Sequence, residues 1–366
     1  MDKSRAPLGY SEYLQLDRLL SAQRRMSEAA GQPAHDELLF IVVHQAYELW
    51  FKLILFELAR IERIFAGPVA DERDIGRAVQ GLTRVVEVQK LLIQQIEVLE
   101  TMTPLDFLDF RDLLIPASGF QSLQFRLIET RLGLRRAERS TLAGKHFDAL
   151  LPETDRRQLK ETEAAPSLHD LVERWLARTP FVALPDYSFR DAYRQAVVEA
   201  LEADVAHLRA RPGAASKGGK AELGALEAAR ARFDALFEPE RYAALKKEGQ
   251  WRMAAEALQA ALFITLYRDE PVAQQPFALL RLLMDVDEKL TAWRTRHALM
   301  VQRMIGRKVG TGGSAGYDYL QATVERHRIF GDLFALSTYL IPRSKLPPLP
   351  PKVRRAMGYS YGQPRE

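Results

Sequence analysis

Two histidines occupy positions that helical spacing would bury. In the segment FIVVHQAYELW, His44 shares one helical stripe with the apolar residues four positions before it and seven after it. His297 lies in the same way between Trp293 and Met300. An imidazole on an apolar helix face can be a core histidine with a satisfied hydrogen bond. It can also be the neutral nitrogen ligand or the distal group of a haem pocket. Residue spacing leaves both interpretations open.

Arg111 is the third residue that could do chemistry. It stands in DFLDFRDLLIPASGF, on a short predicted helix with Phe107, Phe110 and Leu114. A guanidinium among apolar side chains can pair with a neighbour such as Asp112. Alternatively, it can offer its planar fork to the carboxylate of a substrate.

Several other kinds of site are excluded by composition. The chain has no cysteine, which rules out disulfides, thiolate metal sites, iron–sulfur clusters and cysteine nucleophiles. Its seven histidines form neither an HExxH motif nor any i, i+4 pair, and there is no G-x-S-x-G motif. The net charge of +4 comes from interleaved charges in 366 residues. We therefore expect no nucleic-acid partner.

A glycine-rich segment, GTGGSAG at residues 310–316, fits the loose form of a dinucleotide-binding loop. A predicted helix precedes it, however, and no βαβ unit surrounds it, which argues against that assignment. The segment is either an ordinary connection or a flexible loop that closes over a small ligand, with the hydroxyls of Thr311 and Ser314 available for hydrogen bonding.

The elements that must position these residues are helices. Nearly every periodic segment has the helical period and no run alternates as a strand would, so we predict an all-α fold. We expect a helix near residues 10–20, a long one over 75–99 and the longest over 277–305. The expected helix ends are N-caps at Thr103 (ahead of Pro104), Ser118 (with Gln121) and Ser167, and a stop at Gly133.

The less regular segments give further expectations. The Gly/Ala/Ser/Lys-rich stretch 211–225 is typical of a flexible surface loop, and the Pro-rich stretch 342–366 is typical of a polyproline-like tail. No apolar run approaches the roughly 18 residues of a membrane span. The first residues, MDKSRAPLGYSEY, have no apolar core of a signal peptide. We expect a cytoplasmic protein without a membrane partner.

Four segments resemble one known family. HDELLFIVVHQAYELWFKLILFEL, MTPLDFLDFRDLLIPASGFQSLQFRLIE, WRTRHALMVQRMIGRKVGTGGSAGYDYL and LSTYLIPR closely resemble tryptophan 2,3-dioxygenases, and the likeness runs from GYSEYLQLDRLLSAQ to YLIPR. It is weakest over 136–165, 211–225 and the tail. The resemblance implies an all-helical, homotetrameric enzyme with haem b in its ferrous form. Such an enzyme opens the indole ring of L-tryptophan with O2 to N-formylkynurenine, the first step of the kynurenine route.

The resemblance also implies roles for particular residues. His297 would be the axial ligand of the haem iron, His44 would hydrogen-bond the indole N–H, and Arg111 would hold the substrate carboxylate. Thr311 would help to hold the ammonium group. Phe40, Phe107 and Leu114 would wall the indole, with Ser118 near the distal pocket, and a neighbouring subunit would lend Tyr10, Tyr13 and Leu14. The chain departs from animal relatives at Gln302, where they carry a second histidine.

The predicted organisation has one helical haem domain with a smaller helical insertion. Residues 1–135 would form the N-terminal arm and distal helices, 136–270 the insertion, 271–341 the proximal helix and substrate loop, and 342–366 the tail. Two other functions stay open at this point. One is a haem monooxygenase on the same scaffold that inserts a single oxygen into an indole or phenol, and the other is a non-enzymatic helical adaptor.

Overall fold

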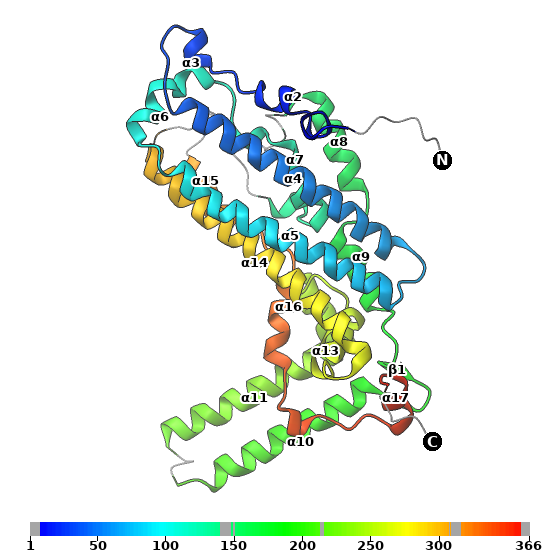
Figure 1. Cartoon of the computed structure of the whole chain (residues 1–366). Helices are drawn as coiled ribbons and strands as arrows, with labels where there is room; N and C mark the ends of the chain where they lie inside the picture. The colour runs from blue at the N-terminus through cyan, green and yellow to red at the C-terminus, as the bar shows by residue number, and fades with distance from the viewer. Residues whose placement is uncertain are drawn as a thin grey trace, which may run out of the picture.

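Three long helices form the centre of the molecule (Figure 1). The computed structural model describes residues 8–139, 148, 151–212, 216–306, 308 and 316–359. Helices α4 (Glu37–Ala66), α5 (Glu72–Leu99) and α14 (Pro271–Ile305) run side by side, and α5 packs against both of the others. The protein is 75% helical with 1% strand, which confirms the all-α prediction.

Capping and proline residues mark the N-terminal ends of two central helices, α5 and α14. Asp71 caps α5 by accepting a hydrogen bond from the backbone N–H of Asp74. Helix α14 is longer than predicted, because it begins at Pro271 and continues through Pro276. A proline removes one helical hydrogen bond, but burial of Leu279 and Leu280 against the core compensates for that loss.

A series of short helices follows α5: α6 (Pro104–Arg111), η1 (Asp112–Leu114), η2 (Gly119–Gln121) and α7 (Leu123–Leu132). Thr103 caps α6 as predicted, with Asp106 completing the reciprocal hydrogen bond. Ser118 caps only the single turn η2, and α7 starts later, at the cap Ser122. Gly133 ends α7 as predicted, with a φ of 124°.

Next along the chain are η3 (Arg136–Glu138), α8 (Glu153–Ala164), α9 (Leu168–Leu176), α10 (Phe189–Ala210), α11 (Lys217–Phe237), α12 (Pro239–Lys247) and α13 (Ala255–Leu266). Helix α8 packs against α7 in the upper half of the molecule, whereas α10, α11 and α13 lie in the lower half (Figure 1). Ser167 caps α9 as predicted. Strands β1 (Ala183–Leu184) and β2 (Tyr187–Ser188) form a minimal antiparallel pair. Helices α10 and α11 pack against each other and project from the body (Figure 1).

Two predictions about irregular segments are wrong in part. Helix α11 starts at Lys217, so residues 217–225 are helical rather than a loop, because strong helix formers outweigh the glycines among them. The tail contains η6 (Arg343–Lys345) and α17 (Pro351–Ala356), and it is anchored by the buried side chains of Val353 and Met357.

The remaining described elements lie near the chain ends. Helices α1 (Tyr10–Leu14), α2 (Leu16–Leu20) and α3 (Met26–Ala29) precede α4, and α15 (Gly316–Arg326), α16 (Gly331–Ala335) and η5 (Leu336–Tyr339) follow α14. One continuous cluster of buried side chains joins α4, α5, α9, α13 and α14. The division at residues 135 and 270 remains a prediction.

Helix α4 is unusually long and apolar. Judged by length and composition alone, it is the one helix in the described parts of the chain that could cross a membrane, contrary to the expectation from the sequence. Only 22% of its most apolar window is buried within the chain. A single such helix is weak evidence for a membrane span, because core helices of other proteins pass the same criterion.

Candidate functional site

One cavity of about 240 Å³ brings together the three residues that could do chemistry, His44, Arg111 and His297. Its walls come from the three central helices and from α6, η2, α7 and α15. Five of the predicted site residues line it: His44, Phe107, Arg111, Ser118 and His297. The long helices α4 and α14 therefore present their histidines to the same space.

His44 has a defined tautomer. Its Nδ1 lies 2.7 Å from the carbonyl oxygen of Phe40, one turn earlier in α4. A carbonyl only accepts hydrogen bonds, so Nδ1 carries the proton and Nε2 is left as an acceptor. Burial lowers the pKa of His44, which keeps the ring neutral near pH 7. The distal candidate is thus a neutral imidazole with one unprotonated nitrogen.

His297 is also neutral. Burial, and then the nearby His44, lower its pKa to about 4. The indole of Trp293 is stacked on its ring, with centroids 5.1 Å apart and planes within 4° of parallel. Across the described parts of the chain, its buried Nδ1 has no hydrogen-bond partner. A neutral ring facing an apolar cavity can bind a metal through its other nitrogen.

Arg111 stands at the end of α6, where the capped helix delivers it to the cavity. Its helix neighbours Phe107 and Phe110 pack edge to face at 5.5 Å, and Phe110 is fully buried. This aromatic base holds α6 in place. The result is a guanidinium on the wall of a largely apolar space, a suitable position for binding a carboxylate.

Other predicted residues lie near the cavity or away from it. Phe40 lies behind His44, with ring centroids 4.1 Å apart, and Leu114 is half-buried against the core; neither lines the cavity. Tyr10 and Tyr13 are 76% and 74% exposed in the single chain, and Leu14 is 40% exposed. Thr311 and most of the 310–316 loop lie outside the described residues.

A buried ionic cluster on the cavity wall was not predicted from the sequence. Glu129 of α7 accepts hydrogen bonds from Arg126, Arg139 and Arg294, and Nδ1 of His327 lies 3.6 Å from it. Burial alone would raise the pKa of Glu129, but the surrounding arginines hold it well below its usual range. Arg126, Glu129 and Arg294 line the cavity. The i, i+3 pair in SLQFRLIE was the available signal, but such pairs are common on exposed helices.

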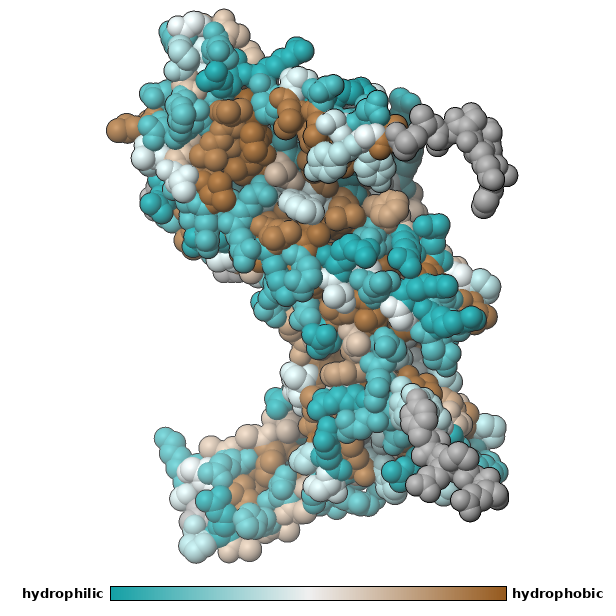
Figure 2. All heavy atoms as spheres, in the orientation of Figure 1, coloured by the Kyte–Doolittle hydropathy of each residue, from teal (hydrophilic) through white to brown (hydrophobic). Residues whose placement is uncertain are grey.

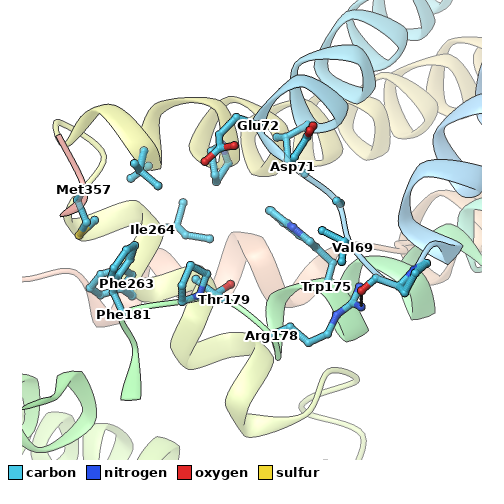
Figure 3. A pocket seen from close by; sticks show the side chains of 17 residues that line it. Val69, Asp71, Glu72, Trp175, Arg178, Thr179, Phe181, Phe263, Ile264 and Met357 are labelled. Atoms are coloured by element: carbon cyan, nitrogen blue, oxygen red, sulfur yellow. Dashed lines mark hydrogen bonds between the residues drawn. The ribbon is translucent and has the colours of Figure 1, made fainter. Parts of the chain in front are cut away.

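A second cavity, of about 270 Å³, lies at the opposite end of α5 (Figure 3). Its apolar wall includes Trp175, and two polar groups of its lining, Asp71 and Arg178, are engaged in the fold. Asp71 caps α5, and Nη1 of Arg178 donates to the carbonyl of Pro68 at 2.8 Å. Among the residues that the structure describes, no histidine lines it. The chemistry expected of the two histidines therefore belongs to the first cavity.

A third group of residues has metal-ligand chemistry. The ligand atoms of His169, Asp170 and Glu173, all on α9, lie within 4.8 Å of one another. The ammonium of Lys246, however, is 3.7 Å from the Glu173 carboxylate, which also accepts the backbone N–H of Ala254. The Lys246 ammonium is thus already beside the Glu173 carboxylate, and its positive charge would repel a metal ion. We assign no metal to this group.

The fold and the cavity define a class of protein: an all-α protein in which two neutral histidines from separate long helices face one apolar space. The sequence profile of tryptophan 2,3-dioxygenase matches residues 1–340. The chain therefore belongs to the tryptophan 2,3-dioxygenase family.

Individual relatives agree with the profile. The chain is 48% identical over 355 residues to the tryptophan 2,3-dioxygenase of Bdellovibrio bacteriovorus, covering 97% of this chain and 99% of that one. It is 45% identical over 353 residues to the Dictyostelium discoideum protein of the same name, covering 96% and 88% of the two chains. The Aedes aegypti protein is 44% identical over 364 residues, covering 99% and 92%.

Proposed function

We propose that this protein is a haem-dependent dioxygenase that inserts both atoms of O2 across the indole C2=C3 bond of L-tryptophan, giving N-formylkynurenine. Family membership supports this reaction over a single-oxygen insertion. One structural observation carries the proposal: His44 and His297 are both held neutral and line one cavity with Arg111 on its wall.

The residues of the cavity fit a haem. A neutral His297 offers a nitrogen to the iron, and the aliphatic and aromatic side chains on the lining suit an apolar macrocycle. Arg126 and Arg294 on the same lining pair with Glu129, and with Arg139 three guanidinium groups surround this one carboxylate; the positive charge left over would attract the carboxylates of haem b. When bound, a ferrous haem supplies the iron at which O2 is activated.

The protein's part in the reaction is mainly to position the substrate. The indole C2=C3 bond is electron-rich, so orienting it beside the oxidant accounts for much of the catalysis. Arg111 would bind the carboxylate of tryptophan through its planar fork, and Thr311 would hold the ammonium group. Phe107 on the lining and Phe40 behind His44 would confine the indole, together with Leu114 and Ser118.

His44 would orient the indole through a hydrogen bond. Its Nε2 is an acceptor, because Nδ1 donates to the carbonyl of Phe40. The indole N–H is a very weak acid, so His44 would accept this hydrogen bond without removing the proton. Apolar walls would exclude water from the reacting groups.

The proposal includes a cytoplasmic homotetramer in which Tyr10, Tyr13 and Leu14 complete a neighbour's site. The absence of cysteine supports a reducing compartment. Four apolar side chains on one exposed face of α4, spaced four, seven and seven residues apart, support association: Leu38, Val42, Leu49 and Phe56. Figure 2 shows apolar clusters on the upper part of the molecule, where α4 faces the viewer.

The decisive experiment is reaction of the haem-reconstituted protein with L-tryptophan under 18O2. We expect a Soret band and a product that carries two labelled oxygen atoms. One labelled atom would indicate the monooxygenase instead. A protein that stays colourless after haem supplementation would contradict both enzymatic functions and favour a helical adaptor.

A further inference from the structure

We infer that Trp293 is a positioning residue for His297: its indole face holds the imidazole in one rotation, in which Nδ1 meets no hydrogen-bond acceptor among the residues that the structure describes. This inference rests on the proposed haem-binding function, because it concerns the orientation of the axial ligand.

A metal-binding histidine is usually held in place by a second hydrogen bond. Such a ring ordinarily donates its second N–H to a carboxylate or carbonyl, which fixes its orientation and strengthens its donation to the metal. Nδ1 of His297 is buried and has no hydrogen-bond partner among the residues that the structure describes. Its orientation must therefore come from packing.

The packing that holds the ring is a parallel stack. Trp293 precedes His297 by one helical turn on α14, and the two rings lie 5.1 Å apart with an interplanar angle of 4°. Rotation of the imidazole about its Cβ–Cγ bond would drive its edge into the indole face. The stack thus restricts the rotation that a hydrogen bond would otherwise restrict.

Trp293 is itself held by two further aromatic rings. Phe125 of α7 packs at 5.0 Å, and Tyr47 of α4 packs edge to face at 6.2 Å and 69°. The Tyr47 hydroxyl donates to the carbonyl of Leu92 at 2.7 Å, which ties the ring to α5. Tyr47 lies one turn from His44, so the helix that carries the distal histidine also supports the proximal stack.

The chemical consequence is a weakly donating axial ligand. An imidazole without an acceptor at Nδ1 keeps its proton and pushes less electron density to the metal than a carboxylate-bonded one. A weaker donor favours the ferrous state, in which haem binds O2. Trp293 would therefore help to hold the redox state that the proposed reaction needs.

The test uses the haem-loaded full-length chain and three variants. Trp293→Leu removes the stack, Trp293→Phe retains a planar ring, and Trp175→Leu removes an equally large ring from the other cavity as a matched control. The ferrous iron–histidine stretching band and the haem midpoint potential report on the ligand. Transfer of haem to excess apomyoglobin reports on its retention.

We expect Trp293→Leu to broaden the band and shift it to higher frequency, to lower the midpoint potential and to weaken haem retention by roughly 10-fold or more, as for other groups that orient metal-bound histidines. Trp293→Phe and Trp175→Leu should resemble the wild type. An unchanged band in a folded Trp293→Leu variant would overturn the inference.

Two measurements on the wild type keep the inference testable if Trp293→Leu does not fold. A wild-type band at the high frequency of carboxylate-bonded histidines would overturn it without any variant, and a low frequency would support it. Absence of a Soret band in the wild type would instead contradict the proposed function on which it rests.

Discussion

At the scale of single residues, the lowered pKa of His44 predicts how tryptophan affinity depends on pH. Burial lowers this pKa below the ordinary value of 6.5, so the ring stays neutral and able to accept above that pH. Affinity for tryptophan should be constant from pH 8 to about 6.5 and fall only in more acidic solution, where Nε2 becomes protonated. A decline that starts above pH 7 in a titration of binding would contradict the assigned role.

The same residue can be tested with a methylated ligand. His44→Ala should weaken tryptophan binding by about 0.5–3 kcal/mol, the range from a net hydrogen bond to an unpaired buried donor. N1-methyltryptophan has no indole proton, so its binding should change far less. Comparing the two ligands with the two proteins gives a coupling energy, and a coupling of zero would make His44 only a structural histidine.

Arg111→Ala should act mainly on KM. Removing one partner of a buried charged pair costs on the order of 2–5 kcal/mol, and the substrate carboxylate would lose its only proposed guanidinium partner. Steady-state kinetics with tryptophan and with tryptamine, which lacks the carboxylate, measure this effect. If the wild type used tryptamine as well as tryptophan, the proposed carboxylate contact would be absent.

His297→Ala should lose haem. Its ring is the only imidazole that α14 presents to the cavity, so the variant would lack the neutral nitrogen for the iron. The Soret absorbance per chain after reconstitution measures this, with exposed His35→Ala as control. Full haem content and normal turnover in His297→Ala would exclude this residue as the axial ligand.

At the scale of elements, the close packing at Gly133, where α7 ends, predicts that a larger residue there would destabilise the fold. Gly133 has φ of 124°, and a Cβ there would come within 2.7 Å of Cβ of His169. Gly133→Ala should lower the free energy of unfolding by about 2–4 kcal/mol, from backbone strain and overpacking together. Gly31 also has positive φ, at 72°, but open space around it, so Gly31→Ala should cost about 1–2 kcal/mol. Equal midpoints in urea would contradict the close contact.

At the scale of the whole molecule, we predict that the exposed apolar face of α4 is an interface between subunits. Phe56 is 69% exposed and Leu49 52% exposed in the single chain, which is costly for large apolar side chains on one stripe. The double variant Leu49→Ser, Phe56→Ser should lower the mass measured by light scattering. Val69→Ser is the matched control, because Val69 is 75% exposed but lies outside α4. An unchanged mass in the double variant would place the interface elsewhere.

Local interactions explain which features could be predicted from the sequence. The caps at Thr103 and Ser167 each involve residues three positions apart, and the stop at Gly133 requires only a conformation that glycine adopts readily. The helical period of the apolar residues reflects burial of one face, which predicted the helices and marked both His44 and His297.

Only the tertiary structure decided how those helices meet. It placed His44 and His297 on one cavity, set Trp293 against the imidazole, and added Arg139 and Arg294 to the Arg126 that already neighbours Glu129 on α7. His44 and His297 are distant in the chain, as are Glu129 and Arg294, and the stack of Trp293 on His297 within α14 is itself supported by rings of α4 and α7. The energies of these arrangements depend on packing and on removal of water rather than on local preference. The sequence alone therefore determined which side chains could do the chemistry, and the packing of α4, α7 and α14 decided their protonation, orientation and partners.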